Sequence, residues 1–308
     1  MSISKFAEVL YQTILSKRVK ERSEKAILAI AIASFLLHLM VIYLVDFKFI
    51  TLSSSSELLG NPIAAIYTPF SFILLYEVYL LIYYLPQSFA TYIGKQYEVI
   101  TLIVIRRLFK DLSNLNLTDD WFNVKYDLQF TYDLVTAVLM FFLIYLFYKQ
   151  SNKGQNPTEV QDSASLSKFI HIKKIIATFL VPIFIALTVY SFTSWLLSVI
   201  HSEKNNYNSF NNINNIFFEQ FFTILIFADV LILLFSFFIT DQFHRVIRNS
   251  GFIISTILIR ISFSTSGFLS NVLIVSAIVF GLLIIGIHNK FEKYISPEKI
   301  RKNGPNEH

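Results

Sequence analysis

Long apolar stretches constrain the fold of this chain more than any other feature. Six of them approach or exceed the roughly 20 residues that an α-helix needs to cross the hydrocarbon core of a bilayer. They cover residues 26–45, 63–89, 130–148, 175–200, 217–239 and 268–287. Strands of a membrane barrel would be about half as long and would alternate apolar and polar residues. The stretches therefore predict an all-α fold, a polytopic bundle of transmembrane helices.

The composition supports a membrane environment. Hydrophobic residues make up 54% of the 308 residues and charged residues only 15%, whereas a soluble domain has about 25% charged residues. A soluble core could not hide this much apolar surface, but lipid can solvate it. The chain has no cysteine, which excludes disulfides and thiolate metal sites.

Two further apolar segments carry arginines inside them. Residues 97–112 include Arg106, Arg107 and Lys110, and residues 251–264 include Arg260. Each segment is either a spanning helix with buried arginine or an amphipathic helix that lies in the membrane interface. Six to eight membrane segments are therefore expected.

The distribution of basic residues favours eight crossings. Lysine and arginine gather before residue 26, in the linker 149–174 and after residue 289, and such segments prefer the cytoplasm. Six crossings would place the linker outside the cell, which contradicts the cytoplasmic preference of its lysines. Eight crossings place every basic segment inside and the acidic loop 113–127 outside. Both termini are thus expected in the cytoplasm of a multi-pass plasma membrane protein. Abundant Asn, Ile, Lys and Phe with only 8 glycines indicate an AT-rich bacterial genome, hence an inner membrane.

The sequence suggests two similar halves. Residues 99–106 (VITLIVIR) correspond to residues 253–260 (IISTILIR), and an acid precedes each of these segments, Glu77 and Asp229 respectively. Four crossings per unit would make the two copies parallel. We expect a first repeat over residues 25–148 and a second over residues 169–288, joined by a cytoplasmic linker, 149–168, and followed by a basic tail, 289–308.

The N-terminal segment, residues 1–24, has two interpretations. Phe6, Val9, Leu10, Gln12 and Ile14 fit a short amphipathic helix on the membrane surface, which would bring the basic residues that follow it close to anionic lipid headgroups. The alternative is a solvated basic tail.

The two acids lie near the middle of predicted spans, where an isolated carboxylate is costly. At a rise of 1.5 Å per residue, Arg106 would lie roughly 13 Å and Glu77 roughly 18 Å from the same membrane edge. We therefore predict a Glu77–Arg106 pair and, by the same reasoning, an Asp229–Arg260 pair; Arg107 is a further candidate. Each pair either lines a hydrated path or clamps two helices together.

Two other residues are weaker candidates. His38 lies within the first span, and a lone histidine there is more often a packing residue than a ligand. Asp133 lies at the start of the span 130–148, where it caps the helix or lines a vestibule, and capping is favoured. No motif of a known catalytic or metal site is present, so we expect neither an enzyme nor a bound cofactor or metal.

An acid on one helix and arginines on the next are similar in charge arrangement to voltage-sensor modules. The arginines of this chain are adjacent, as in Arg106 and Arg107, or single, as in Arg260. They are not repeated every third residue along a long helix, so the resemblance is confined to the arrangement of charges.

Two functions fit the sequence. The first is a channel or transporter for a small ion, with its path near the carboxylate–arginine pairs. The second is a non-transporting scaffold or sensor that acts through partner proteins. The net charge of +5 is explained by basic cytoplasmic segments, which fit anionic lipid headgroups rather than nucleic acid. An oligomer is compatible with either function.

Overall fold

The computed structural model describes residues 3–48, 62–113, 125–153, 163–201, 209–238, 242–263, 265 and 267–302. This part of the chain is helical and contains no strand, which confirms the all-α prediction. The elements are α1 (Ile3–Ile14), α2 (Lys17–Asp46), the 3-10 helix η1 (Pro62–Ile66), α3 (Tyr67–Tyr84), α4 (Phe89–Ser113), α5 (Lys125–Lys153), α6 (Ser163–His201), α7 (Ser209–Phe237), α8 (Phe243–Ser262) and α9 (Phe268–Lys302).

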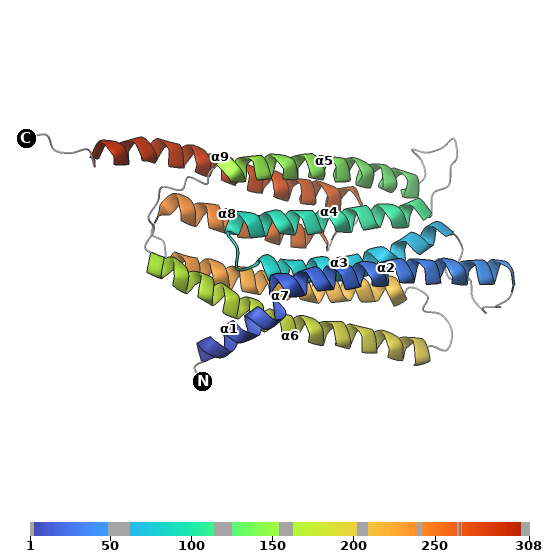
Figure 1. The fold of residues 1–308 in the computed structure, drawn as a ribbon. Helices are drawn as coiled ribbons and strands as arrows, with labels where there is room; N and C mark the ends of the chain where they lie inside the picture. Colours follow the sequence, from blue (N-terminus) through green and yellow to red (C-terminus); the bar gives the residue numbers. More distant parts are fainter. Residues whose placement is uncertain are drawn as a thin grey trace, which may run out of the picture.

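Helices α2 to α9 lie side by side in one bundle, and each runs antiparallel to the helix before it (Figure 1). We call the end where α2 begins and α9 ends the proximal end, and the opposite end the distal end. The short helix α1 crosses α6 at the proximal end. The contact includes Glu8, whose carboxylate lies 2.9 Å from the Lys174 ammonium. Of the two interpretations of this segment, the helix is the one observed for residues 3–14; its location on the membrane surface stays a prediction.

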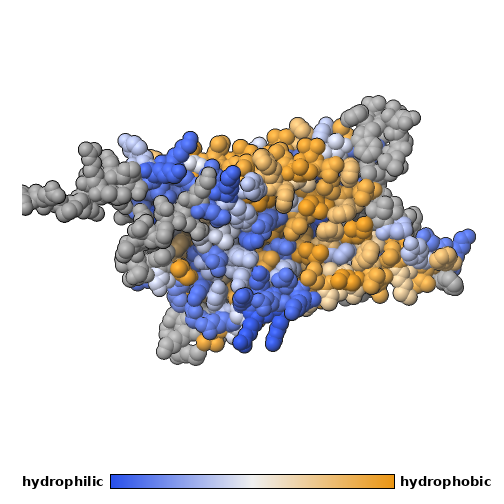
Figure 2. All heavy atoms as spheres, turned by 45° about the horizontal axis from the view of Figure 1, so that its top comes forward, coloured by the Kyte–Doolittle hydropathy of each residue, from blue (hydrophilic) through white to orange (hydrophobic). Residues whose placement is uncertain are grey.

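The surface of the bundle is suited to lipid. Figure 2 shows apolar side chains in a broad band, with hydrophilic side chains gathered most densely towards the proximal end. Large apolar side chains such as Leu37, Phe141 and Phe179 are exposed. Five of the described helices, namely α2, α5, α6, α7 and α9, contain stretches long and apolar enough to cross a membrane. The chain is therefore a multi-pass membrane protein.

The two arginine-containing segments, residues 97–112 and 251–264, belong to α4 and α8. Both helices run along the bundle with the others (Figure 1), and at 1.5 Å per residue they are about 37 Å and 30 Å long. Helix α4 packs against α3, α5 and α8, and α8 packs against α7 and α9. Large buried side chains anchor them, including Tyr92, Ile93 and Tyr97 on α4 and Phe252 and Ile253 on α8.

The helix boundaries differ from those predicted. We expected a single apolar span over residues 63–89, but α3 ends at Tyr84, because Pro86 has no backbone N–H with which to continue the helix. Helix α4 then begins at Phe89, after Ser88, whose Oγ accepts a hydrogen bond from the Thr91 backbone N–H at 3.2 Å. Helix α4 is therefore eight residues longer at its start than the predicted segment 97–112.

A close approach of three helices lies near the middle of the bundle. The Tyr97 hydroxyl of α4 lies 2.7 Å from Ser255 Oγ of α8, and Ser255 Oγ in turn donates to the Ala277 carbonyl of α9 at 2.6 Å. Since a hydroxyl has one proton to give, the Tyr97 hydroxyl is the donor to Ser255. Gly281 of α9 faces the same hydroxyl, and a Cβ atom at this glycine would overlap it.

This contact makes Gly281 intolerant of a side chain. Overpacking of this kind costs about 1–3 kcal/mol, so we expect Gly281→Ala to lower the thermal unfolding midpoint of the purified protein in detergent. Gly286→Ala is the matched control on the same helix, because a Cβ there meets no atom within 4 Å. Tyr97→Phe removes the hydroxyl and should recover part of the loss. Equal midpoints for the two alanine variants would contradict the packing described.

Candidate functional site

Helix α4 carries polar side chains into the interior of the bundle. Gln96, Thr101 and Arg106 are all buried, although the helix is surrounded by apolar neighbours. Gln96 lies about 10 Å and Arg107 about 27 Å along α4 from its proximal end. Each of these two residues takes part in a separate polar cluster, and we name the clusters after the carboxylates that they contain.

The Asp229 cluster lies in the proximal half and joins α7, α4 and α6. Asp229 is 1% exposed, and its Oδ2 accepts a hydrogen bond from Gln96 Nε2 at 3.1 Å. Tyr92 and Lys173, both buried, also act electrostatically on this carboxylate. The Lys173 ammonium donates to the Gln87 carbonyl at 2.5 Å and lies 4.9 Å from the centre of the Phe89 ring.

The Asp229 carboxylate is incompletely satisfied. Among the residues that the structure describes, its buried Oδ1 accepts no hydrogen bond of standard geometry, although the Tyr92 hydroxyl lies close enough to interact with the carboxylate. Burying a charged oxygen without a partner is costly in any protein interior, and more so at membrane depth. A proton, a cation or water at Oδ1 would relieve this cost.

The Asp133 cluster lies in the distal half and joins α4, α5 and α9. Arg107 Nε donates to Asp133 Oδ2 at 2.5 Å, while Asn271 Nδ2 and Gln129 Nε2 donate to Asp133 Oδ1 at 2.6 Å and 2.7 Å. Arg107 Nη2 also donates to Asn271 Oδ1 at 2.5 Å. The Asp133 side chain is fully buried and that of Arg107 is 29% exposed. In contrast to Asp229, both oxygens of this carboxylate are satisfied.

The predicted Glu77–Arg106 pair is wrong. Because α3 ends at Tyr84 and α4 begins at Phe89, Glu77 lies about 10 Å and Arg106 about 25 Å from the proximal ends of their helices. Glu77 instead shares its surroundings with Glu98, Lys95, Glu24 and Lys20.

The predicted Asp229–Arg260 pair is wrong for the same reason. Asp229 lies about 12 Å from the proximal end of α7 and Arg260 about 26 Å from that of α8. Arg260 Nη2 donates to Thr223 Oγ1 of α7 at 2.9 Å. The predicted spans end five and two residues beyond α3 and α7, and the predicted arginine segments begin eight residues after the starts of α4 and α8. The second error is the larger one, and it places both arginines too close to the proximal end.

The two weaker candidates have different outcomes. His38 Nδ1 lies 2.5 Å from Thr68 Oγ1, so it joins α2 to α3 in the packing role that the sequence favours. Asp133 does not cap a helix, because α5 begins at Lys125 and Asp133 lies two turns inside it.

Sequence reasoning missed Gln96, Lys173 and Asn271. Gln96 precedes the predicted segment 97–112, and Lys173 lies at the end of the basic stretch 149–174 that the sequence places in the cytoplasm. Their sequence signal is weak, because a single amide or amine in an apolar stretch can equally mark the end of a membrane-spanning helix. The four-residue spacing of Tyr92 and Gln96 places both on one face of α4, and this spacing could have identified the Asp229 side of the helix.

Comparison of the chain with protein-family models, with characterised proteins and with solved structures found no match. Its class therefore follows from the structure itself: a multi-pass α-helical membrane protein with buried polar clusters. Within the described residues, no group of three or more His, Asp or Glu side chains is arranged to hold a metal ion.

The Asp133 cluster should behave as a structural clamp. Removing one partner of a buried ion pair costs about 3–5 kcal/mol, so Asp133→Asn and Arg107→Gln should each lower the thermal unfolding midpoint in detergent. The loss should be larger for Arg107→Gln, because this change leaves the fully buried Asp133 charge without its ion partner, whereas Asp133→Asn leaves a partly exposed arginine. The double variant should lose less than the sum of the two single variants.

Arg18→Gln provides the control, since Arg18 is exposed at the proximal end and should tolerate the change. Additive losses at Asp133 and Arg107 would show that the two side chains do not stabilise the bundle through each other.

Proposed function

We propose that the chain is a transporter or channel for a small ion and that Asp229 is its ion-binding residue. The observation that carries the proposal is a buried carboxylate with one oxygen that lacks a well-formed hydrogen bond, held by the neutral Gln96 amide rather than by a direct ion pair. Ionisable residues at this depth are costly, and those that persist mark ion or proton pathways. The site would take a proton or a small cation.

The proposed topology has eight crossings, α2 to α9, with the proximal end in the cytoplasm. Exposed basic residues at this end support the orientation, since cytoplasmic segments carry an excess of lysine and arginine; they include Lys17, Arg18, Lys25, Lys149, Lys168, Lys290 and Lys293. The lengths of α4 and α8 support the number of crossings, because about 30 Å of helix spans the hydrocarbon core.

Two parallel four-helix repeats are part of this proposal. The order of neighbours is the same in both halves, α2–α3–α4–α5 and α6–α7–α8–α9, and the corresponding helices α4 and α8 contact each other, as do α5 and α9. Arg106 and Arg260 both lie seventeen residues beyond the first residues of their helices, Phe89 and Phe243. This equivalence supports an axis near the membrane normal between the halves.

The proposed path follows α4 between the two clusters. Gln96 and Arg107 are about 16 Å apart along the helix, and between them α4 buries Ile100 and Val104, each 1% exposed. These apolar side chains separate the clusters in the present conformation. Alternating access therefore fits the interior better than a continuously open pore. The ion would reach Asp229 from the proximal side, and the apolar layer of Ile100 and Val104 would have to part before the ion could continue, while the Asp133 cluster holds the distal half together.

Reconstituted protein in liposomes tests this function. Proton, sodium and potassium gradients are imposed one at a time, and at least one of them should drive a flux of its ion, measured with an internal pH dye or ion-sensitive dye. Asp229→Asn should abolish this flux, because the amide cannot carry the negative charge. Asp229→Glu keeps the carboxylate and should retain part of the flux. Asp46→Asn is the matched control, because Asp46 is exposed at the distal end of α2.

Two outcomes would count against the proposal. A flux that is unchanged in a stable Asp229→Asn variant would remove Asp229 from the path. The absence of any proton, cation or anion flux in either direction would favour the second function, a scaffold or sensor that acts through partner proteins.

A further inference from the structure

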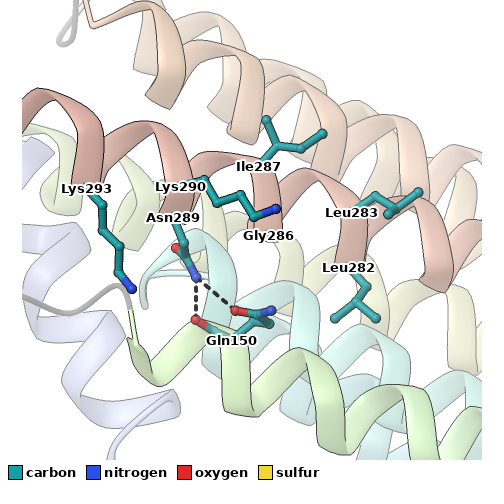
Figure 3. Close-up of a pocket in the computed structure, with 8 residues that line it drawn as sticks. All are labelled: Gln150, Leu282, Leu283, Gly286, Ile287, Asn289, Lys290 and Lys293. Atoms are coloured by element: carbon teal, nitrogen blue, oxygen red, sulfur yellow. Dashed lines mark hydrogen bonds between the residues drawn. The ribbon is translucent and has the colours of Figure 1, made fainter.

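A groove opens on the outer surface between α5 and α9, and none of its lining residues belongs to either polar cluster. Its main cavity has a volume of about 430 Å³ and is lined by α9 together with Gln150 of α5 (Figure 3). A second cavity of about 240 Å³ shares Gln150 and Leu282 with it and extends it to Leu146 and Lys149. The main cavity falls within the range of about 300–1,000 Å³ that is typical of ligand sites.

A glycine and an amide contact define the groove. A Cβ atom at Gly286 would meet nothing within 4 Å, so the missing side chain leaves open space on the face of α9. Asn289 Nδ2 donates to the Gln150 carbonyl at 2.7 Å, and this bond attaches the end of α5 to α9. The groove is thus open over Gly286 and closed at Asn289 by a polar contact (Figure 3).

The groove changes from apolar to basic along α9. Leu282 and Leu283 lie about 21 Å and 22 Å from the distal start of this helix, whereas Lys290 and Lys293 lie about 33 Å and 38 Å from it. The hydrocarbon core is about 30 Å thick. If α9 enters the core at Phe268, the leucines face acyl chains and the lysines lie at the level of the headgroups.

The charge at the proximal end of the groove has one sign. Lys149, Lys290 and Lys293 border it, and none of the residues that line the two cavities is acidic. The nearby Glu292 lies on another face of α9, where its carboxylate is 3.9 Å from His288 Nε2. The rim therefore complements an anion, and the apolar floor complements a hydrocarbon chain.

We propose that this groove is a binding site for an anionic phospholipid from the leaflet at the proximal end. The phosphate and the anionic headgroup contact Lys290 and Lys293, with Lys149 at the other side of the groove. An acyl chain lies over Gly286 against Leu282 and Leu283. This site does not depend on the proposed ion transport, because it rests only on the membrane-embedded surface of α5 and α9.

Native mass spectrometry of the full-length protein in detergent tests the site. Phosphatidylglycerol and phosphatidylcholine with identical acyl chains are titrated separately, and the wild type should bind the first phosphatidylglycerol more tightly. Lys290→Ala/Lys293→Ala should weaken the binding of phosphatidylglycerol on the order of tenfold at low salt and leave that of phosphatidylcholine unchanged. Gly286→Phe fills the groove and should weaken the binding of both lipids.

Matched controls separate the site from the general surface. Lys17→Ala/Lys25→Ala removes two exposed lysines from the same end of the bundle, and Val138→Phe adds a ring to an exposed position of α5 distant from Gln150; neither should change binding. Inorganic phosphate should not displace the lipid. The site is disproved if the lysine and glycine variants bind both lipids like the wild type, or if phosphate alone competes as well as phosphatidylglycerol does.

Discussion

The need to keep the polar side chains of α4 away from lipid organises the whole bundle. A polar group that faces hydrocarbon has no water to bond with, so it must find a partner inside the protein. Helix α4 meets this constraint by packing against α3, α5 and α8. Buried polar side chains of α4 then form hydrogen bonds with side chains of the neighbouring helices instead of facing lipid. The more apolar helices, such as α2 and α5, can then present their exposed side chains to lipid.

The two carboxylates that approach α4, Asp133 and Asp229, differ in how completely their oxygens are hydrogen-bonded. Asp133 has a charged partner in Arg107 and two amide donors, so its charge is stable where it is. Asp229 has the Gln96 amide and a nearby buried lysine, Lys173, and one of its oxygens remains unsatisfied. This difference underlies the different roles that we propose for the clusters. The satisfied pair joins helices, and the proposed ion exchange at the other carboxylate would not need to break a strong pair.

The class of the protein was predictable from the sequence because it depends on long apolar stretches, which small errors in boundaries do not alter. The side-chain pairs depend on those boundaries, and an error of five residues at the end of α3 moves Glu77 by more than 7 Å along the helix. The sequence identified Arg107 and Asp133 as separate candidates, but only the packing of α4 against α5 brings them together. Gln96 and Lys173 could not be identified, because neither has a local pattern that distinguishes a buried polar residue from one at a membrane edge.

We propose that α4 crosses the membrane as one of eight helices, and site-directed labelling can decide whether it does. The natural chain has no cysteine, so single cysteines can be introduced at Ser88, before α4, and at Asp120, in the segment between α4 and α5, with Lys48 and Lys293 as references for the distal and proximal ends. With eight crossings, a membrane-impermeant thiol reagent applied from outside should label the cysteines at positions 120 and 48 and should not reach those at positions 88 and 293. Labelling of position 120 only from the cytoplasmic side would contradict the crossing of α4, and with it the proposed topology and the parallel repeats.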